Sequence, residues 1–282
     1  MNYQHGFHAG NFADVVKHVT LSRIIAHLCM KPAPFRVIDT HAGAGLYDLA
    51  GTEASRTGEW RAGIARLLQA PLTAAARALL APYRDAVAAL NPPENLKVYP
   101  GSPLLIRTWL RRRDRLIACE LEPGAAAALA ENLAGSPGAK ALAIDGWTAL
   151  SAYLPPKERR GLVFVDPPFE TPDEFARLAA AFAAAQRKWA SGIYLLWYPI
   201  KDRQGPDALA KRLRRLGINN ILRAELMLSR RPDANRLNGC GLIVINPPWT
   251  LEGELAVLLP ALAACLSQCE GGFRLDWLAR EN

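Results

Sequence analysis

Residues 161–169 read GLVFVDPPF, an apolar run that ends in an acid, two prolines and an aromatic ring. The apolar run is typical of a β-strand buried on both faces. The prolines stop strand pairing, and Pro167 holds Asp166 in an extended conformation. Parallel sheets bind ligands at the carboxyl ends of their strands. The Asp166 carboxylate, the Pro167 carbonyl and the Phe169 ring therefore predict a site for a planar group that carries an amine. The alternative is an ordinary strand-to-loop junction.

A glycine-rich loop follows an earlier predicted strand. Val37 and Ile38 form that short strand, which breaks at Asp39 before Gly43 and Gly45. Glycine lets backbone approach a ligand closely. A dinucleotide-binding fingerprint would need a third glycine and a helix that opens directly on the loop, and the LYD sequence that follows supplies no such glycine. The loop therefore favours a nucleoside ligand without a pyrophosphate.

Acidic residues also end the next two predicted strands, at Glu120 and Asp145. A carboxylate only accepts hydrogen bonds, so Glu120 suits the two hydroxyls of a ribose, and Asp145 can accept from an adenine amino group. Each acid taken alone is better explained as a helix cap or a turn former. The order of glycine loop, Glu120, Asp145 with Gly146, and then Asp166 favours a nucleoside site.

The N-terminal segment gathers polar side chains around a predicted helix whose N-cap is Asn11. His5 and His8 precede this helix and Lys17 lies within it, while Asp14 and His18 are four residues apart and share a face. The cluster has no cysteine and one obvious carboxylate, so we expect no metal. The alternative for each histidine is a hydrogen-bonded cap of the N-terminus.

Strands and helices alternate along the chain, which predicts an α/β domain with a mostly parallel sheet and right-handed crossovers. Only a loop joins the last two strands, so the final strand should be antiparallel. A second tetrapeptide, NPPW at 246–249, then lies at the opposite edge from Asp166, and we assign it a structural role. The seven expected strands lie near residues 37–38, 115–120, 139–145, 161–165, 192–200, 221–228 and 241–245.

A helical insertion is predicted after the glycine loop. Residues 52–95 contain two helical stretches, 59–69 and 73–91. The expected crossover helix begins only at Ser102, as N-cap, with Pro103 in the first helical position. We therefore expect one main domain, residues 1–51 and 96–282, and a small inserted helical subdomain, residues 52–95. Because the insert leaves the carboxyl end of the first strand, it is either a lid over the ligand or a packing appendage.

Composition limits the cellular setting. No apolar run approaches the roughly 18 residues of a membrane span, and the N-terminus carries His and Asp where a signal peptide would be apolar. We expect a cytoplasmic protein without a membrane partner. The five cysteines include no C-x-x-C pair, so reduced thiols are expected. The net charge of +8 and the clustered arginines favour a polyanionic partner, although each cluster alone is explained by a solvated helix face.

These motifs resemble a known family. The order of glycine loop, acidic strand end, Asp-Gly and Asp-Pro-Pro-Phe is similar to that of the S-adenosylmethionine-dependent amino methyltransferases. The segments YQHGFHAGNFADVVKH, DTHAGAG, YPGSP, DGW, RRGLVFVDPPF, GIYLLWYP and INPPW more closely resemble the ribosomal large-subunit methyltransferase J family. The resemblance covers nearly the whole chain. The sequence departs from the family pattern at Gln4 and Gly6, and also at Phe169, where tyrosine is frequent in the family.

The resemblance implies a Rossmann-like class I methyltransferase fold and N6-methylation of one adenine, adenine 2030, in 23S rRNA. S-adenosyl-L-methionine is the implied cofactor. The implied substrate is naked 23S rRNA or an early assembly intermediate, and we expect a monomer. The implied catalytic residues are Asp166, Pro167 and Phe169. The implied cofactor-binding residues are Lys17, His18, Asp39, His41, Gly43, Ser102, Glu120, Asp145, Gly146 and Asp166, and Tyr3 and His5 are implied to meet the target nucleotide.

Three other functions remain open from the sequence. An adenine-N6 DNA methyltransferase shares the catalytic tetrapeptide, but no extra segment is large enough for a separate sequence-reading domain. A glutamine methyltransferase of proteins would favour Asn-Pro-Pro-Tyr, whereas Asp166 is acidic. A non-catalytic RNA-binding module could keep the same fold.

Overall fold

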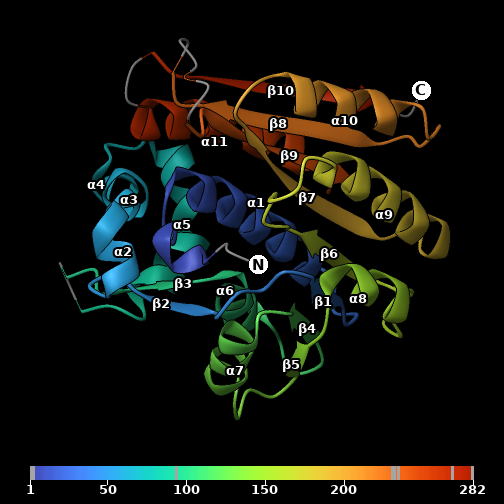
Figure 1. Cartoon of the computed structure of the whole chain (residues 1–282), viewed down its shortest axis with the longest axis horizontal. Coiled ribbons are helices and arrows are strands. Elements are labelled where there is room, and N and C mark those ends of the chain that lie inside the picture. Colours follow the sequence, from blue (N-terminus) through green and yellow to red (C-terminus); the bar gives the residue numbers. More distant parts are fainter. Residues whose placement is uncertain (1–3, 93–94, 230–232, 234–235, 268–269, 281–282) are drawn as a thin grey trace.

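The sheet at the centre of the molecule has eight strands. The computed structural model describes residues 4–92, 95–229, 233, 236–267 and 270–280. The strands are β1 Arg36–Asp39, β4 Arg115–Glu120, β5 Ala139–Ala143, β6 Gly161–Val165, β7 Ile193–Ile200, β8 Ile221–Met227, β9 Gly239–Ile245 and β10 Gly272–Ala279. Their order across the sheet is β10-β8-β9-β7-β6-β1-β4-β5 (Figure 1).

The five strands β1, β4, β5, β6 and β7 run parallel to one another, and β9 pairs antiparallel with both β7 and β8. The expected α/β class, with a mostly parallel sheet and an antiparallel ending, is confirmed. The sheet has one strand more than the seven expected, because β10 pairs antiparallel with β8 at the sheet edge. Charged residues alternate with apolar ones in β10, so it lacks the apolar run that marks a buried strand.

Strand β6 is buried along its whole length, as predicted. Leu162 and Phe164 belong to the apolar core on one face of the sheet, while Val163 and Val165 belong to the core on the other. Successive side chains of a strand point to opposite faces. A continuous run of apolar residues therefore forms a central strand between two helix layers.

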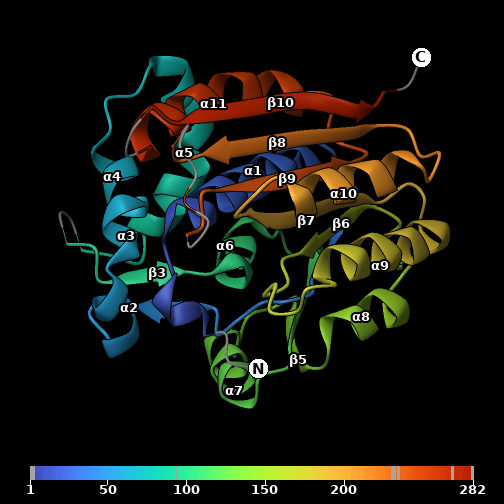
Figure 2. The same cartoon turned by 45° about the horizontal axis from the view of Figure 1, so that its top comes forward.

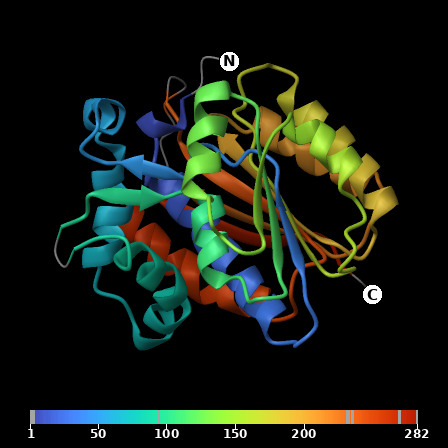
Figure 3. The ribbon, with the colours of Figure 1, turned by 90° about the horizontal axis from the view of Figure 1, so that it is seen from below.

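Helices cover both faces of the sheet, as Figures 2 and 3 show from two further directions. Helices α1, α5, α6 and α11 share the core of one face, and α9 and α10 pack on the other. The helices are α1 Phe12–Cys29, α2 Thr52–Thr57, α3 Glu59–Ala62, α4 Ile64–Gln69, α5 Ala74–Ala88, α6 Ser102–Trp109, α7 Pro123–Asn132, α8 Gly146–Ala152, α9 Glu174–Lys188, α10 Gln204–Arg214 and α11 Leu251–Leu266, preceded by the 3-10 turn η1 His5–Phe7.

Helix α1 begins where the sequence predicts, because the Asn11 side chain accepts hydrogen bonds from the backbone N–H groups of Ala13 and Asp14 at 2.9 and 3.0 Å. The helix packs between the sheet, α5, α6 and α11 and is buried on nearly all sides. Its polar residues Lys17 and His18 are therefore removed from bulk water.

Helices α2 to α5 occupy the region of the predicted insertion and lie together at the left in Figures 1 to 3. Strands β2 Leu46–Asp48 and β3 Val98–Pro100 pair antiparallel and bring the two ends of this region together. Its side chains Leu80 and Tyr83 join the same core as α1 and α11. The division of the chain into a main domain and an inserted subdomain stays a prediction.

Two expectations about helix ends are wrong in detail. The stretch 59–69 is split at Gly63, whose backbone is not helical, with φ −104° and ψ −108°. Only glycine fits there, because a β-carbon would lie 2.1 Å from the carbonyl oxygen of Gly10. Gly101 rather than Ser102 is the N-cap of α6, since the Ser102 hydroxyl instead donates to Asp39. No helix in the described part of the chain is both long and apolar enough to cross a membrane.

Arg223 joins β8 to the edge strand β10. Its side chain is 2% exposed, and its guanidinium donates to both carboxylate oxygens of Asp276, at 2.8 and 2.7 Å. These hydrogen bonds lower the pKa of Asp276 below its usual value. The buried Glu225 carboxylate lies 3.9 Å from the same guanidinium.

We predict that Arg223→Ala lowers the free energy of unfolding by about 1.5 to 3 kcal/mol, because it removes a buried side chain and its two hydrogen bonds to the Asp276 carboxylate. Glu225 keeps its contact with Arg203 in this variant. Urea unfolding followed by circular dichroism measures the loss. Arg274→Ala is the matched control, since Arg274 is half exposed and contacts the same Asp276 at 3.1 Å. That variant should lose at most about 1 kcal/mol. Equal losses in the two variants would contradict the assignment.

Candidate active site

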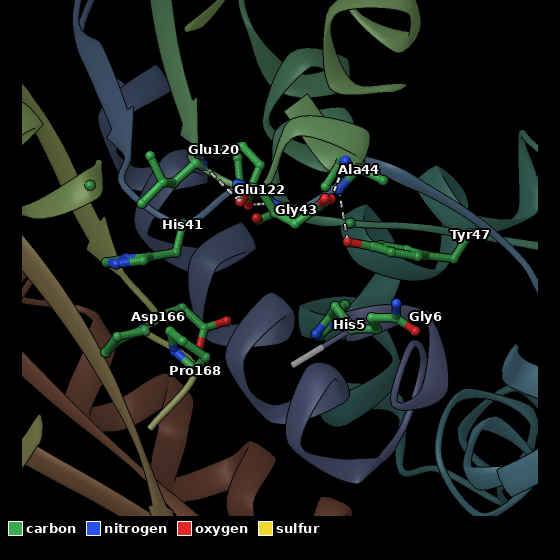
Figure 4. Close-up of a pocket in the computed structure, with 18 of the residues that line it drawn as sticks. His5, Gly6, His41, Gly43, Ala44, Tyr47, Glu120, Glu122, Asp166 and Pro168 are labelled. Atoms are coloured by element: carbon green, nitrogen blue, oxygen red, sulfur yellow. Dashed lines mark hydrogen bonds between the residues drawn. The ribbon is translucent and has the colours of Figure 1, made fainter. Parts of the chain in front are cut away.

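A cavity of about 980 Å³ opens at the carboxyl ends of β1, β4 and β6. Figure 4 shows the glycine loop, the strand ends and the N-terminal segment facing one another across it. Asp39 and Phe169 are not part of its lining, and Tyr3 lies outside the described residues. The lining includes the other residues predicted from sequence: His5, Lys17, His18, His41, Gly43, Ser102, Glu120, Asp145, Gly146, Asp166 and Pro167.

Asp39 lies behind the wall of the cavity and is fully buried. The Ser102 hydroxyl donates to its Oδ2 at 2.7 Å, while its Oδ1 has no hydrogen-bond partner among the described residues. Burial raises the pKa of Asp39 to about 7, although the hydrogen bond from Ser102 opposes the rise. The position therefore favours a neutral carboxyl or a ligand that donates to Oδ1.

Glu120 is fixed by backbone N–H groups. Gly43 donates to its Oε2, and Leu121 and Glu122 donate to its Oε1, each at 2.8 Å. Gly43 can do so because it adopts a positive φ of 62°, which side chains disfavour. A carboxylate offers about four acceptor sites. Glu120 therefore keeps an acceptor site for a further donor.

Asp145 and Gly146 lie at the start of α8. Asp145 accepts hydrogen bonds from the N–H and the hydroxyl of Thr148, both at 3.2 Å, and so caps the helix. Asp145 therefore caps a helix, as the alternative interpretation of the sequence predicts, and it also lines the cavity. A β-carbon at Gly146 would lie 2.1 Å from the Thr40 carbonyl oxygen, so only glycine allows α8 to begin this close to the glycine loop.

Two cavity histidines are held neutral by burial. Burial lowers the pKa of His41 to about 4, and its ring meets the Trp147 ring edge-on at 5.2 Å. Burial also lowers the pKa of His18 to about 3. The His18 Nδ1 lies 2.7 Å from the hydroxyl of Tyr99, which in turn lies 2.9 Å from that of Tyr83. His18 therefore takes part in a buried polar chain that reaches α5.

Lys17 connects α1 to the Asp-Pro-Pro-Phe tetrapeptide that follows β6. Its Nζ lies 2.5 Å from Asp166 Oδ2 and 2.7 Å from Asp14 Oδ1. Asp14 Oδ2 accepts from the N–H of Gly10 at 2.8 Å and lies 3.1 Å from His5 Nε2. The side chains of Lys17 and Asp14 are 5% and 1% exposed. Burial opposes ionisation of Asp14, but the positive charges of His5 and Lys17 outweigh it and lower its pKa well below the usual value.

Sequence reasoning missed two contributors to this array. Asp14 was predicted only as a neighbour of His18 on the helix face. Trp197 lies within the predicted strand β7, where an aromatic residue is usually part of the core, yet it lines the cavity, with its ring centroid 5.8 Å from Lys17 Nζ. Both partnerships depend on contacts between distant parts of the chain, so no local signal could have shown them.

Phe169 adopts a positive φ of 50°, a conformation that is uncommon for residues other than glycine. Its ring packs against Phe175 and Trp197, with centroid distances of 4.8 and 5.8 Å. The ring therefore supports Trp197 in the cavity wall. Its predicted stacking on a base stays a prediction.

The cavity is acidic although the chain as a whole is basic. Its lining contains eight carboxylates but only one lysine and one arginine, Lys17 and Arg177. Such a lining favours a cationic ligand and repels phosphate. In the described residues, no group of three or more histidine, cysteine or acidic side chains is arranged to bind a metal. The carboxylates are those of Asp48, Glu53, Glu120, Glu122, Asp145, Asp166, Glu170 and Glu174.

A mostly parallel sheet with a glycine loop after β1, an acid at the end of β4 and Asp-Pro-Pro after β6 defines a class I methyltransferase. The family model for "Ribosomal RNA large subunit methyltransferase D, RlmJ" matches residues 32–279. The chain is 39% identical to ribosomal RNA large subunit methyltransferase J of Escherichia coli and 37% identical to that of Haemophilus influenzae, over the full length of each. It therefore belongs to the ribosomal RNA large subunit methyltransferase J family.

Solved structures share the fold of this chain. A protein from Legionella pneumophila superposes with a TM-score of 0.88 at 33% identity, covering 96% of this chain and 98% of its own. A probable spermidine synthase from Corynebacterium glutamicum has a TM-score of 0.50 at 11% identity and covers 91% of this chain and 73% of its own. The second similarity concerns the fold alone.

We predict that Asp39→Asn stabilises the protein more at pH 8 than at pH 5. Burial raises the pKa of Asp39 from its ordinary value of 3.8 to about 7, so wild-type stability falls as pH rises between these values. Asparagine cannot ionise, and the gain should be larger by up to about 3 kcal/mol at the higher pH. Urea unfolding at both pH values measures it, with the exposed Asp85→Asn as control. An equal effect at both pH values would contradict the prediction.

Proposed function

We propose that this protein transfers the methyl group of S-adenosylmethionine to the exocyclic N6 amine of one adenine in 23S rRNA, adenine 2030 by resemblance. The observation that carries the proposal is the position of Asp166, held by two prolines at the end of β6 beside an acidic, nucleoside-sized cavity. The names of the two bacterial relatives support the ribosomal RNA of the large subunit as substrate.

The cavity fits S-adenosylmethionine, whose sulfonium and ammonium groups are cations and whose ribose needs acceptors. Asp39 has a buried carboxylate oxygen without a partner, and Glu120 keeps an acceptor site. Lys17, His18 and His41 would line the methionine end, and Ser102 would also contact the cofactor. Glu120 would hold the ribose, and Asp145 with Gly146 the adenine. When bound, the cofactor supplies an electrophilic methyl group.

Asp166 activates the amine in this proposal. The lone pair of an adenine amine is delocalised into the ring, so the nitrogen is a poor nucleophile. The Asp166 carboxylate and the Pro167 carbonyl accept its two N–H groups and favour pyramidal geometry. The cofactor would supply the methyl group, with its sulfur keeping the electron pair of the broken bond, and the methylated nitrogen would pass one proton through the Asp166 carboxylate to water. Phe169 is the proposed aromatic support of the base.

Asp14 is a positioning residue in this proposal. Lys17 occupies Asp166 Oδ2, so the amine competes with the ammonium for the same carboxylate. Asp14 gives Lys17 a second carboxylate at 2.7 Å. The ammonium therefore stays paired when Asp166 takes the amine, which avoids the cost of a buried unpaired charge.

The acidic lining also determines how RNA approaches. Phosphates are repelled by the eight cavity carboxylates, so the target base enters without its backbone. The adenine must therefore be unpaired or extruded from its helix, as other base-modifying enzymes require. The basic residues outside the cavity are left to hold the phosphates.

Transfer of labelled methyl groups to deproteinised 23S rRNA, DNA and ribosomal protein tests the proposed function. We expect label in 23S rRNA, and a loss of at least about 100-fold in Asp166→Ala. Asp85→Ala, an exposed acid on α5, should keep full activity. Undiminished activity of the Asp166→Ala variant would contradict the proposed mechanism.

Label confined to DNA or to ribosomal protein would reject the rRNA assignment. Absence of heat on titration with S-adenosylmethionine would instead support a non-catalytic RNA-binding module.

The role of Asp14 predicts a loss of kcat in Asp14→Asn. With one carboxylate fewer beside it, Lys17 holds Asp166 Oδ2 more strongly against the incoming amine. We expect kcat to fall by about 10-fold, with the KM for S-adenosylmethionine nearly unchanged. Equal changes of kcat and of this KM would show that Asp14 is only structural.

A further inference from the structure

The second tetrapeptide, residues 246–249, holds a tryptophan out in solvent. Trp249 is 81% exposed, well above every other exposed large apolar side chain in the described residues. Asn246 fixes the turn: its Nδ2 donates to the carbonyls of Ala190 and Gly192, both at 2.8 Å. Two prolines then stiffen the chain before Trp249. The backbone that leads to Trp249 is therefore stiff, and the exposed indole contributes little to the core.

This turn lies far from the active site. Strand β9 runs antiparallel to β7, so its last residues lie at the edge where β6 and β7 begin. Asp166 follows the opposite end of β6. A strand of five residues spans roughly 17 Å. Trp249 is therefore separated from Asp166 by about the height of the sheet.

Three elements, α9, α10 and β10, end at this same edge and carry exposed cations there. The hydrogen bonds of Asn246 place the turn against the end of α9, and a bond from its N–H to the Asn220 carbonyl at 2.9 Å places it beside the loop after α10. Figures 1 and 2 show the last turns of α9 and α10 and the end of β10 on one side of the molecule. The exposed cations there are Arg187, Lys188, Arg214, Arg215 and Arg280.

One carboxylate close to the turn, Glu252, already has hydrogen-bond partners. Glu252, in the first turn of α11, accepts from Trp277 at 2.7 Å and from Arg280 at 3.2 Å. Glu252 neutralises Arg280, so the positive charge of the edge comes from the other four cations, Arg187, Lys188, Arg214 and Arg215. We call Trp249 and these four cations the Trp249 surface.

We propose that the Trp249 surface binds a segment of the substrate RNA remote from the target adenine, an inference that rests on the proposed function. A base stacks on the Trp249 indole, and the cations pair with the neighbouring phosphates. A rigid aromatic ring among arginines and lysines matches a partner that is both polyanionic and rich in flat rings. The acidic active-site cavity cannot hold phosphates, so the affinity for RNA has to come from other surfaces.

The test compares a long 23S rRNA fragment with a short stem-loop that carries only the target adenine and its flanking pairs. Trp249→Ala should raise the Kd for the long RNA by about 5- to 100-fold and should also raise the KM for that RNA, with kcat unchanged. The short RNA should bind and react as with wild type. Phe273→Ala, which removes a half-exposed aromatic ring from β10, is the control and should change neither RNA.

The salt dependence tests the cations separately. Replacing Arg214 and Arg215 by alanine should reduce the slope of log Kd against log salt by about 1 to 2 for the long RNA, since each phosphate contact contributes about 0.7 to 0.9. The matched pair Arg66→Ala with Lys140→Ala removes two exposed cations elsewhere and should leave the slope unchanged.

An unchanged Kd for the long RNA in Trp249→Ala would overturn the proposal, and so would an equal loss for the short RNA. A shift in sedimentation caused by Trp249→Ala in the absence of RNA would assign the surface to contacts between protein chains instead. The binding arm is repeated in the Asp166→Ala background, where Trp249→Ala should raise the Kd for the long RNA by the same factor as in the wild-type background. The two proposals can therefore fail independently.

Discussion

The buried Lys17 ammonium, shared between Asp14 and Asp166, is the interaction on which the rest of the site depends. It joins the first helix to the end of β6, 149 residues later in the chain. A buried cation needs carboxylate partners, and each carboxylate needs the cation in return. This mutual requirement explains why α1 lies in the middle of the core with polar residues inward, and why the N-terminal turn at His5 is bound to the same array.

The parallel sheet adds a second constraint, because it collects the ends of β1, β4 and β6 at one edge. Acids at the ends of β4 and β6, with others in the lining, make the cavity negative within a positive protein. A cofactor with two cationic groups suits that cavity, whereas an RNA backbone does not. In our account, the same electrostatics that favour the cofactor limit RNA to inserting a base and leave its phosphates to surfaces outside the cavity.

Local sequence signals explain much of this architecture. The apolar run of β6, the Asn11 cap and the antiparallel β9 were all predictable, because each depends on neighbouring residues or on a short loop. The strand β10 was missed because an edge strand with alternating charges has no buried run. The roles of Asp14 and Trp197 were missed because their partners lie on other elements, and Ser102 was misplaced because a buried carboxylate took its hydroxyl. Tertiary contacts decide which polar residues of a motif meet.

The most direct test of the central claim is to identify the methylated nucleoside. The 23S rRNA is incubated with the enzyme and S-adenosylmethionine, digested to nucleosides and analysed by chromatography with mass spectrometry. Our account predicts a single product, N6-methyladenosine, because Asp166 and the Pro167 carbonyl can both accept only from an exocyclic amine. Methylation at a ring carbon, a ring nitrogen or a ribose hydroxyl would contradict it.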